Sequence, residues 1–375
     1  MPDGVVRLLL GGDVMTGRGV DQILPYPGDP TLHEHSVRDA RRYVELAEAL
    51  NGPIPRPVGF SWPWGDALRA IDEEAPDLRL VNLETSVTRN DDYDPGKGVH
   101  YRMNPDNVGC LTVARLDVCT LANNHVLDFG IRGLEETLDV LAAAAVETTG
   151  AGRHVDEARR PVTVDAGAGK ITVFSVGMPS SGVPARWAAT NERPGVNFVG
   201  SASDAAVADL LERVRQAKHR GGVVVVSIHW GSNWGYRVPT ADVQLAHLLI
   251  DGGVDVLYGH SSHHPRPIEI YQGKLVLYGC GDLVDDYEGI AGYETYRDDL
   301  RLLYLATIHV ESGRLSALRM IPFQARQLRL HRASAEDGTL LANVLDRISR
   351  SFGSGVDMAP DGTLVLTPWA ATHGR

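Results

Sequence analysis

The segment Leu257-Tyr-Gly-His260-Ser-Ser-His263-His264 decides the fold that we expect, because an apolar run leaves a sheet there and paired imidazoles follow at once. Four other apolar runs end in Asp, Glu, Asn or His: Leu8-Leu-Leu-Gly-Gly-Asp13, Leu80-Val-Asn82-Leu-Glu84, Thr120-Leu-Ala-Asn123-Asn124-His125 and Val223-Val-Val-Val-Ser-Ile-His229. Open α/β sheets form their ligand sites at the carboxyl ends of the strands. Carboxylate, amide and imidazole donors gathered at such an edge indicate a polynuclear metal site.

Composition bounds the class of protein. The chain has 375 residues, 43% hydrophobic and 22% charged, enough for a large core in one large domain or two. A formal net charge of -12 disfavours a broad nucleic-acid surface, which needs concentrated lysine and arginine, so we expect no nucleic-acid partner. Three widely spaced cysteines indicate a reducing compartment rather than a disulfide framework. No apolar stretch reaches the roughly 18 residues of a membrane span, so we expect a cytoplasmic protein without membrane insertion.

Strand-like apolar runs alternate with helical patterns along the chain. The expected strands lie near residues 5–11, 77–83, 116–122, 171–177, 223–229, 254–259 and 274–279. The expected helices span residues 36–50, 64–74, 131–145, 203–219 and 240–251. This alternation favours an α/β layered sandwich over a β-barrel. The long stretches 22–36, 51–63 and 88–104 are expected to be ordered loops over the site.

The pattern changes near residue 302. Two apolar runs flank the turn Glu311-Ser-Gly-Arg, which is a hairpin signature and not a parallel unit. A helix near 334–351 and a strand near 363–367 are expected to follow. We therefore divide the chain into a main domain, residues 1–300, and a C-terminal hairpin, helix and strand, residues 301–375, packed on the same domain.

Each polar residue has an ordinary structural explanation when it is taken alone. Asp13 follows two glycines and suits a turn, while Asn123 and Asn124 suit turns or helix caps. His229 fits equally well as a hydrogen-bonded histidine at a strand end. His260 and His263 are harder to explain by packing, because two imidazoles three residues apart lie in a Gly-Ser loop. Taken together, the residues favour the metal site.

The order of these motifs resembles the CapA-like family. The motifs are Gly12-Asp13-Val-Met, Asn82-Leu-Glu84, Ala122-Asn-Asn124-His125 with Asp128 and Gly130, His229-Trp-Gly231, and Gly259-His260 with His263. That family takes its name from poly-γ-glutamate capsule biosynthesis and belongs to the calcineurin-like metallophosphatase superfamily. The similarity spans about residues 5 to 285, and as a set the motifs are specific.

The resemblance implies a fold and a ligand set. The fold would be a four-layer α/β/β/α sandwich of metallophosphatase type, with two divalent metal ions (manganese, zinc, iron or calcium) at the strand ends. Carried over by position, the ligands would be Asp13 and His263 for the first metal, Asn124, His229 and His260 for the second, and Glu84 as the bridge. His125 would be an acid/base group beside Asn124, and we take His125 and Asp13 as the candidate catalytic residues.

Two positions depart from the phosphatase pattern, and a third residue, Asp282, has two possible roles. Met15 stands where phosphatases carry an imidazole, and Glu84 stands where they place Asp. The first metal would therefore be weaker, more oxygen-coordinated or absent, and phosphomonoesterase activity does not follow from the fold. Asp282, in Gly279-Cys-Gly-Asp282, would support the site or make a turn.

Loop residues near the predicted ligands are candidates for substrate binding. We single out Arg18, Arg102, Trp230 and Arg237, with Lys97, Trp234 and Tyr236 as further loop candidates. Arg18 follows the first ligand by five residues, where a guanidinium can hold an anionic group. The alternatives are a solvated surface arginine for Arg18 and local loop packing for the tryptophans.

The leading hypothesis is a metal-dependent enzyme that acts on a peptide-like or polyglutamate-like substrate by hydrolysis or transfer at an amide or phosphoester. One alternative within the resemblance is a cofactor-free peptide epimerase of the lasso-peptide tailoring type, which needs a second base opposite His125. The other is a non-catalytic polyanion-binding module, for which the missing imidazole at Met15 is the best support.

Overall fold

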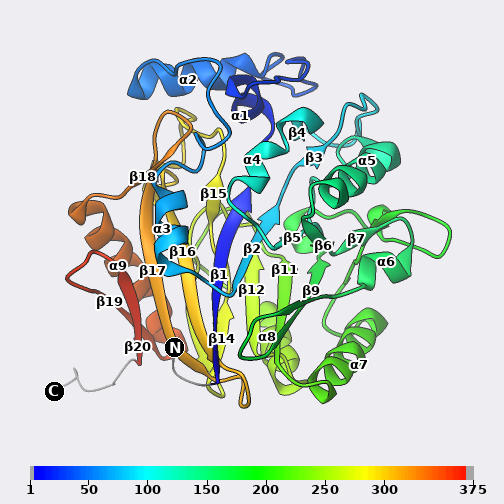
Figure 1. The fold of residues 1–375 in the computed structure, drawn as a ribbon, viewed down its shortest axis with the longest axis vertical. Coiled ribbons are helices and arrows are strands. Elements are labelled where there is room, and N and C mark those ends of the chain that lie inside the picture. The colour runs from blue at the N-terminus through cyan, green and yellow to red at the C-terminus, as the bar shows by residue number, and fades with distance from the viewer. Residues whose placement is uncertain (1–3, 369–375) are drawn as a thin grey trace.

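The computed structural model describes residues 4–368, and two β-sheets form its framework (Figure 1). The larger sheet of that part has ten strands in the order β19-β20-β17-β16-β1-β2-β5-β6, with β15 beside β1 and β18 beside β17. These strands are β1 (Val5–Val14), β2 (Leu78–Leu83), β5 (Val118–Thr120), β6 (Glu147–Thr149), β15 (Asp282–Val284), β16 (Leu300–His309), β17 (Leu315–Ala325), β18 (Leu330–Arg332), β19 (Ser354–Met358) and β20 (Leu364–Pro368). β1, β2, β5, β6 and β15 run parallel to one another, while β16 runs antiparallel to β1.

The second sheet has six strands in the order β13-β14-β12-β11-β9-β8. Its strands are β8 (Val162–Asp165), β9 (Lys170–Gly177), β11 (Val223–His229), β12 (Val256–His260), β13 (Ile268–Tyr271) and β14 (Lys274–Leu277). The four central strands are parallel and the two outer ones antiparallel. Two small ribbons pair β3 (Ser86–Val87) with β4 (Arg102–Met103), and β7 (Ala151–Gly152) with β10 (Gly195–Val196).

Helices flank both sheets (Figure 1). They are α1 (Arg18–Ile23), α2 (Arg41–Asn51), α3 (Asp66–Glu74), α4 (Gly109–Thr112), α5 (Gly130–Ala143), α6 (Val155–Arg159), α7 (Ala205–His219), α8 (Thr240–Asp251) and α9 (Ala335–Ser349). Short 3-10 turns are η1 (Pro105–Asn107), η2 (Pro179–Ser181), η3 (Ala185–Trp187), η4 (Glu294–Tyr296) and η5 (Arg350–Phe352). None of the helices in residues 4–368 combines the length and the apolar character that crossing a bilayer requires.

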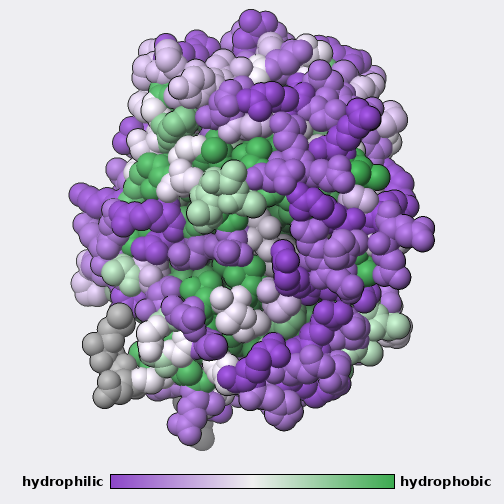
Figure 2. Space-filling view, turned by 45° about the vertical axis from the view of Figure 1, so that its right-hand side comes forward, coloured by the Kyte–Doolittle hydropathy of each residue, from purple (hydrophilic) through white to green (hydrophobic). Residues whose placement is uncertain are grey.

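Strand alternation explains why the inner strands are apolar on both faces. In β1, Leu8 and Leu10 join an apolar cluster shared with the second sheet, while Leu9 joins a cluster with α2, α3 and α5. In β11, Val225 lies in the shared cluster and Val224 in a third cluster with α7 and α8. Burying one such leucine or valine contributes roughly 1.5–3 kcal/mol. On the face of the molecule that Figure 2 shows, hydrophilic residues cover most of the surface and apolar residues lie toward its middle.

Two hydrogen bonds join the sheets near the carboxyl ends of their parallel strands. The Tyr258 hydroxyl in β12 donates to the Gly11 carbonyl in β1. The Ser227 hydroxyl in β11 lies 3.2 Å from the Thr120 hydroxyl in β5. Residues at the ends of β1, β2 and β5 are therefore brought close to those at the ends of β11 and β12.

The structure confirms the mixed α/β class, and strands and helices occur in every range where the sequence predicts them. The predicted C-terminal hairpin is β16–β17, which continues the larger sheet beyond β1. The predicted last helix and strand are α9 and β20, but β19 was not predicted. The division at residue 300 stays a prediction. All three cysteines are buried free thiols.

Candidate metal centre

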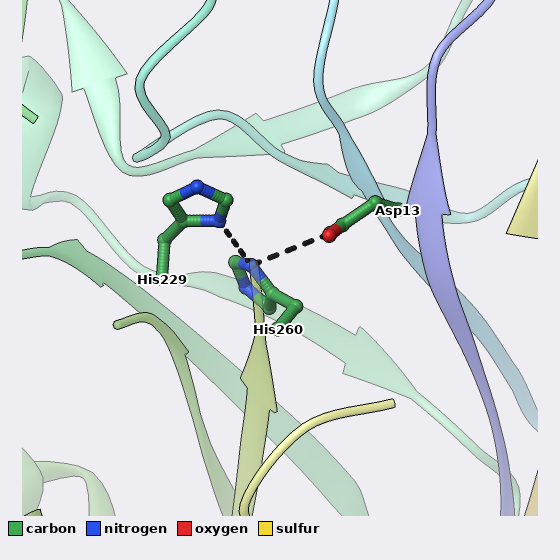
Figure 3. Close-up of side chains that lie close together, drawn as sticks. All are labelled: Asp13, His229 and His260. Carbon is green, nitrogen blue, oxygen red and sulfur yellow. Dashed lines mark hydrogen bonds and ion pairs between the residues drawn. The ribbon is translucent and has the colours of Figure 1, made fainter. Parts of the chain in front are cut away.

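Asp13, His229 and His260 form the centre of the site (Figure 3). His229 and His260 are the last residues of β11 and β12, and the parallel register pairs them directly. Asp13 comes from β1 in the other sheet. All three side chains are buried, and one ligand atom from each lies within 4.8 Å of the others. Residues far apart in sequence therefore form one group that could bind a metal ion.

Both imidazoles are held by neighbours that fix their orientation. The Nδ1 atoms of His229 and His260 lie 2.8 Å apart, and His260 Nε2 lies 2.7 Å from the Ser227 hydroxyl. His229 Nε2 lies 3.0 Å from Asn124 Oδ1 and 3.7 Å from Glu84 Oε1. Burial lowers the pKa of His260 to about 3. Burial and then His260 hold the pKa of His229 well below its ordinary value. Both rings are thus neutral near pH 7, the form that binds metal ions.

Two buried carboxylates face these imidazoles. Asp13 accepts hydrogen bonds from Asn82 Nδ2 at 2.7 Å and from the Ser261 amide at 3.0 Å. Burial and the nearby Asp282 carboxylate raise the pKa of Asp13 to about 7. Burial and then repulsion from Asp13 and Asp282 raise the pKa of Glu84 well above its usual range. A divalent cation would relieve both effects, because it neutralises charges that burial and crowding disfavour.

The side chains present fit a bound divalent cation. The donors combine carboxylate, amide and imidazole groups, which suit manganese, zinc or iron. Asp282 Oδ2 is buried and has no hydrogen-bond partner among residues 4–368, which is unusual for a buried polar atom. Asp13, Glu84, Asn124, His229 and His260 lie in one neighbourhood, as the sequence predicts, although their roles as ligands stay predictions.

His125 lies at the side of this group with an acid-base environment of its own. Its Nδ1 lies 2.6 Å from Asp128 Oδ2, and its Nε2 lies 3.8 Å from Glu84 Oε1. Lys97 donates to Asp128 and to the Asn124 carbonyl. Because a carboxylate only accepts, Asp128 places the proton of neutral His125 on Nδ1 and leaves Nε2 as an acceptor. Burial lowers the pKa of His125 to about 4, so the ring is a neutral base at pH 7.

His263 lies on another side of the group. Its Nδ1 is 3.0 Å from Asp282 Oδ1, and its Nε2 is 3.0 Å from Asn233 Nδ2. Burial lowers the pKa of His263, but the Asp282 carboxylate, with Asp13 and Asp285, raises it to a net value above the usual one. Asp282 therefore supports His263 directly.

Two tyrosines join the loops above the site. The hydroxyls of Tyr101 and Tyr287 lie 2.6 Å apart. The Tyr101 ring meets the His125 ring at 4.4 Å between centroids, and the Tyr287 ring meets the His263 ring at 5.0 Å, both edge to face. These contacts connect the loop before β4 with the segment after β15.

The four residues predicted to bind substrate occupy different environments. Arg18 is buried, and its guanidinium donates to Asp286, Glu34 and Tyr43. Trp230 is only 2% exposed, packs in the core with α7 and α8, and donates to the Tyr278 carbonyl. Arg102 contacts Asp91 and the Asn90 carbonyl, and Arg237 is exposed. These placements give Trp230 no exposed face for a substrate and leave the role of Arg237 a prediction.

Sequence reasoning did not assign several residues that the structure places at the site. Tyr101 and Tyr287 carry no motif that would mark them. The sequence suggests Lys97 only as a substrate contact, whereas its ammonium group lies against Asp128 and Asn124. Asp128 stood in the quoted motif, and its spacing of three residues from His125 is the signal that points to a hydrogen-bonded pair.

Comparisons with known proteins place the chain in a family. The family model described as "Bacterial capsule synthesis protein PGA_cap" matches residues 7–287. A "Probable polyglutamine synthesis accessory protein" of Mycobacterium tuberculosis (strain CDC 1551 / Oshkosh) is 52% identical over 371 residues, which cover 98% of this chain and 97% of that protein. The "PGA biosynthesis protein CapA" of Bacillus subtilis (strain 168) is 27% identical over 303 residues, covering 80% of this chain and 68% of the relative.

A solved structure from Thermus thermophilus covers 83% of this chain and 97% of its own, at 10% identity and a TM-score of 0.39, too low to support a conclusion. The family model and the mycobacterial relative each span most of the chain. This chain belongs to the bacterial capsule synthesis protein PGA_cap family, whose CapA members it resembles in sequence.

Proposed function

We propose that this protein is a metal-dependent enzyme that acts on a peptide-like or polyglutamate-like substrate, by hydrolysis or transfer at an amide bond. The observation that carries the proposal is the convergence of Asp13, His229 and His260 from two sheets into one buried group. The names of the relatives, which refer to polyglutamine synthesis and to PGA biosynthesis, support the substrate class.

We propose the four-layer α/β/β/α arrangement of metallophosphatases for this fold, and three apolar clusters support it. One apolar cluster lies between the two sheets, a second lies between the larger sheet and α2, α3 and α5, and a third lies between the smaller sheet and α7 and α8. Helix, sheet, sheet and helix layers account for these three clusters. The candidate metal centre then lies where the two inner layers meet at their strand ends.

Two cation positions account for the ligand-type side chains. His229, His260 and Asn124 would hold one ion, Asp13 and His263 would hold the other, and Glu84 would bridge them. Divalent cations bound there would polarise a carbonyl or phosphoryl oxygen and stabilise negative charge that develops on it.

The surrounding residues would move a proton and exclude water. His125 would accept a proton at Nε2, because Asp128 holds the Nδ1 proton and burial keeps the ring neutral. Lys97 would keep Asp128 ionised, since its ammonium group and His125 hold the pKa of Asp128 below the usual value in spite of burial. Tyr101 and Tyr287 would limit water above the site.

An aromatic wall stands beside His263 and His264. Trp234 stacks on Tyr293 with ring centroids 3.9 Å apart, and Tyr296 stacks on His264 at 4.6 Å. Trp234 and Tyr296 are partly exposed, and Tyr293 is exposed. Such a wall would pack against the planar amide groups of an extended peptide chain.

The proposal is tested with manganese-loaded protein and two substrates, γ-linked glutamate oligomers and glutamine oligomers, in deuterated water. New amino ends that form with manganese, but not with EDTA or in His229→Ala, would support hydrolysis. Deuterium that enters the peptide without cleavage would select the epimerase instead. Protein that binds the oligomers equally well with EDTA and leaves them chemically unchanged would contradict the enzymatic proposal and favour a binding module.

A further inference from the structure

Asp282 lies beside Asp13 on a short strand that sequence reasoning did not predict. β15 pairs in parallel with β1, and the register makes Asp13 and Asp282 direct partners. The Asp13 amide donates to the Gly281 carbonyl at 3.0 Å, which fixes this approach. Partners on adjacent strands project their side chains from the same face of a sheet. The two carboxylates therefore point into the same buried space.

The Asp282 side chain has one oxygen bound and one oxygen without a partner. Its Oδ1 lies 3.0 Å from His263 Nδ1. Its Oδ2 is buried and finds no hydrogen bond within residues 4–368, and the residue is 1% exposed. An unpaired buried carboxylate oxygen is costly unless a cation neutralises it.

No lysine or arginine in the described part of the chain forms an ion pair with Asp13, Glu84 or Asp282. The buried cations nearby are engaged elsewhere: Arg301 pairs with Asp285, Arg18 with Asp286 and Glu34, and Lys97 with Asp128. The partner that Asp282 does have is the His263 imidazole, whose Nδ1 lies 3.0 Å from Asp282 Oδ1. Three crowded carboxyl groups are thus left without an ammonium or guanidinium partner, an arrangement that a bound metal ion would stabilise.

Met15 cannot supply a nitrogen ligand at this position. Its side chain is buried, and its sulfur lies 3.8 Å from the Tyr287 hydroxyl. We infer that Asp282 is an additional ligand of the first cation, together with Asp13, Glu84 and His263. This inference rests on the proposed function, because it requires the metal centre to exist. The first position is then rich in oxygen and the second in nitrogen, so hard cations such as Mn²⁺ or Mg²⁺ are favoured at the first.

The inference is tested by loading the protein with Mn²⁺ and measuring manganese per chain by elemental analysis after desalting, together with the electron paramagnetic resonance spectrum. The variants are Asp282→Asn, His229→Ala and a matched control, Asp242→Asn. Asp242 is also a buried carboxylate whose pKa is raised by burial, but it lies at the start of α8. We expect two ions and a spin-coupled signal in the wild type and in Asp242→Asn. We expect one ion and an uncoupled signal in Asp282→Asn.

Thermal unfolding in EDTA separates a ligand from a structural residue. With Mn²⁺, Asp282→Asn should lower the Tm by clearly more than it does in EDTA, because only the metal-loaded protein loses a ligand. A fall of equal size in both conditions would show that Asp282 only holds His263 and would overturn the inference. Two tightly held ions in Asp282→Asn would overturn it too.

The result for the wild type distinguishes this inference from the proposed function. A wild type that holds one ion, lost in His229→Ala and kept in Asp282→Asn, would overturn the role of Asp282 and leave the metal enzyme intact. A wild type that holds no ion would overturn both.

Discussion

The Nδ1 atoms of His229 and His260 lie 2.8 Å apart at the ends of two adjacent parallel strands. A shift of register by one residue would turn one of the two imidazoles to the opposite face of the sheet, toward α7 and α8. His260 Nδ1 also lies 3.7 Å from Asp13 Oδ1, which comes from the other sheet. Correct pairing within each sheet and between the sheets is therefore a condition for the metal centre.

Removing ligands should remove metal and leave the fold intact. His229→Ala and Glu84→Ala each delete a side chain at the centre of the site, so we expect bound metal to fall below one ion per chain, with an unchanged circular dichroism spectrum. His247→Ala is the matched control, because His247 lies on α8 and pairs with Glu269 at 3.0 Å, away from the site. Full metal content in both site variants would show that the ligand assignment is wrong.

Metal affinity should depend on pH through Asp13. Its pKa is raised from 3.8 to about 7 by burial and by Asp282, so the metal-free folded protein keeps a proton that a cation must displace. Affinity should rise about tenfold per pH unit up to about pH 7 and then level. Isothermal titration across this range measures it, with Asp13→Asn as the variant that removes the proton.

The same group gives a stability prediction for the metal-free protein. The pKa of Asp13 is about 7 in the folded protein and 3.8 in the unfolded chain, so protonated Asp13 favours the folded state. Its contribution to stability is complete below pH 3.8 and is lost as the pH rises through about 7. Tm measured in EDTA should therefore decline over that interval, and less so in Asp13→Asn. Equal pH profiles for the two proteins would contradict this origin.

Asp128 should matter for turnover more than for metal binding. Asp128→Asn weakens the control of the His125 tautomer, and we expect kcat to fall roughly 10²-fold or more, with metal content unchanged. Asp106→Asn is the control, because Asp106 is an exposed carboxylate that pairs with Arg89. A kcat within a factor of about two of the wild type would remove His125 as the base of the proposed reaction.

Gly12 should be intolerant of a side chain. A Cβ at Gly12 would overlap the Gly281 carbonyl oxygen and push β15 away from β1. We expect Gly12→Ala to lower the free energy of unfolding by about 1–3 kcal/mol and to reduce metal content, because Asp13 and Asp282 would separate. Gly59→Ala meets open space and should change neither. An unchanged metal content in Gly12→Ala would show that this strand contact does not hold the site together.

The sequence predicted the principal strands because long apolar runs mark buried parallel strands. It also predicted that these strand ends meet, but along the edge of one sheet, whereas the structure brings them together from two sheets. It could not predict β15, which has only three residues and forms through pairing with a strand far away in the chain. The ion pair between Arg18 and Asp286 could not be predicted either, because the two residues are 268 positions apart in the sequence.

The direction of the Trp230 side chain could be predicted from the alternation of residues along the strand. Successive residues of a strand point to opposite faces, so a His229 side chain that faces the site turns its neighbour away from it. Trp230 accordingly packs into the core with α7 and α8. Trp234, four residues further along, stacks on Tyr293 at the surface instead. Alternation therefore separates the two tryptophans, although both lie close to a predicted ligand in sequence.

The most direct test of the metal centre is a crystal structure of the manganese-loaded protein with anomalous diffraction data collected at the manganese edge. We predict one anomalous peak bonded to Asn124, His229 and His260. A second peak should be bonded to Asp13, Asp282 and His263, with Glu84 in contact with both. Crystals of fully loaded protein with no anomalous peak among these side chains would contradict the account.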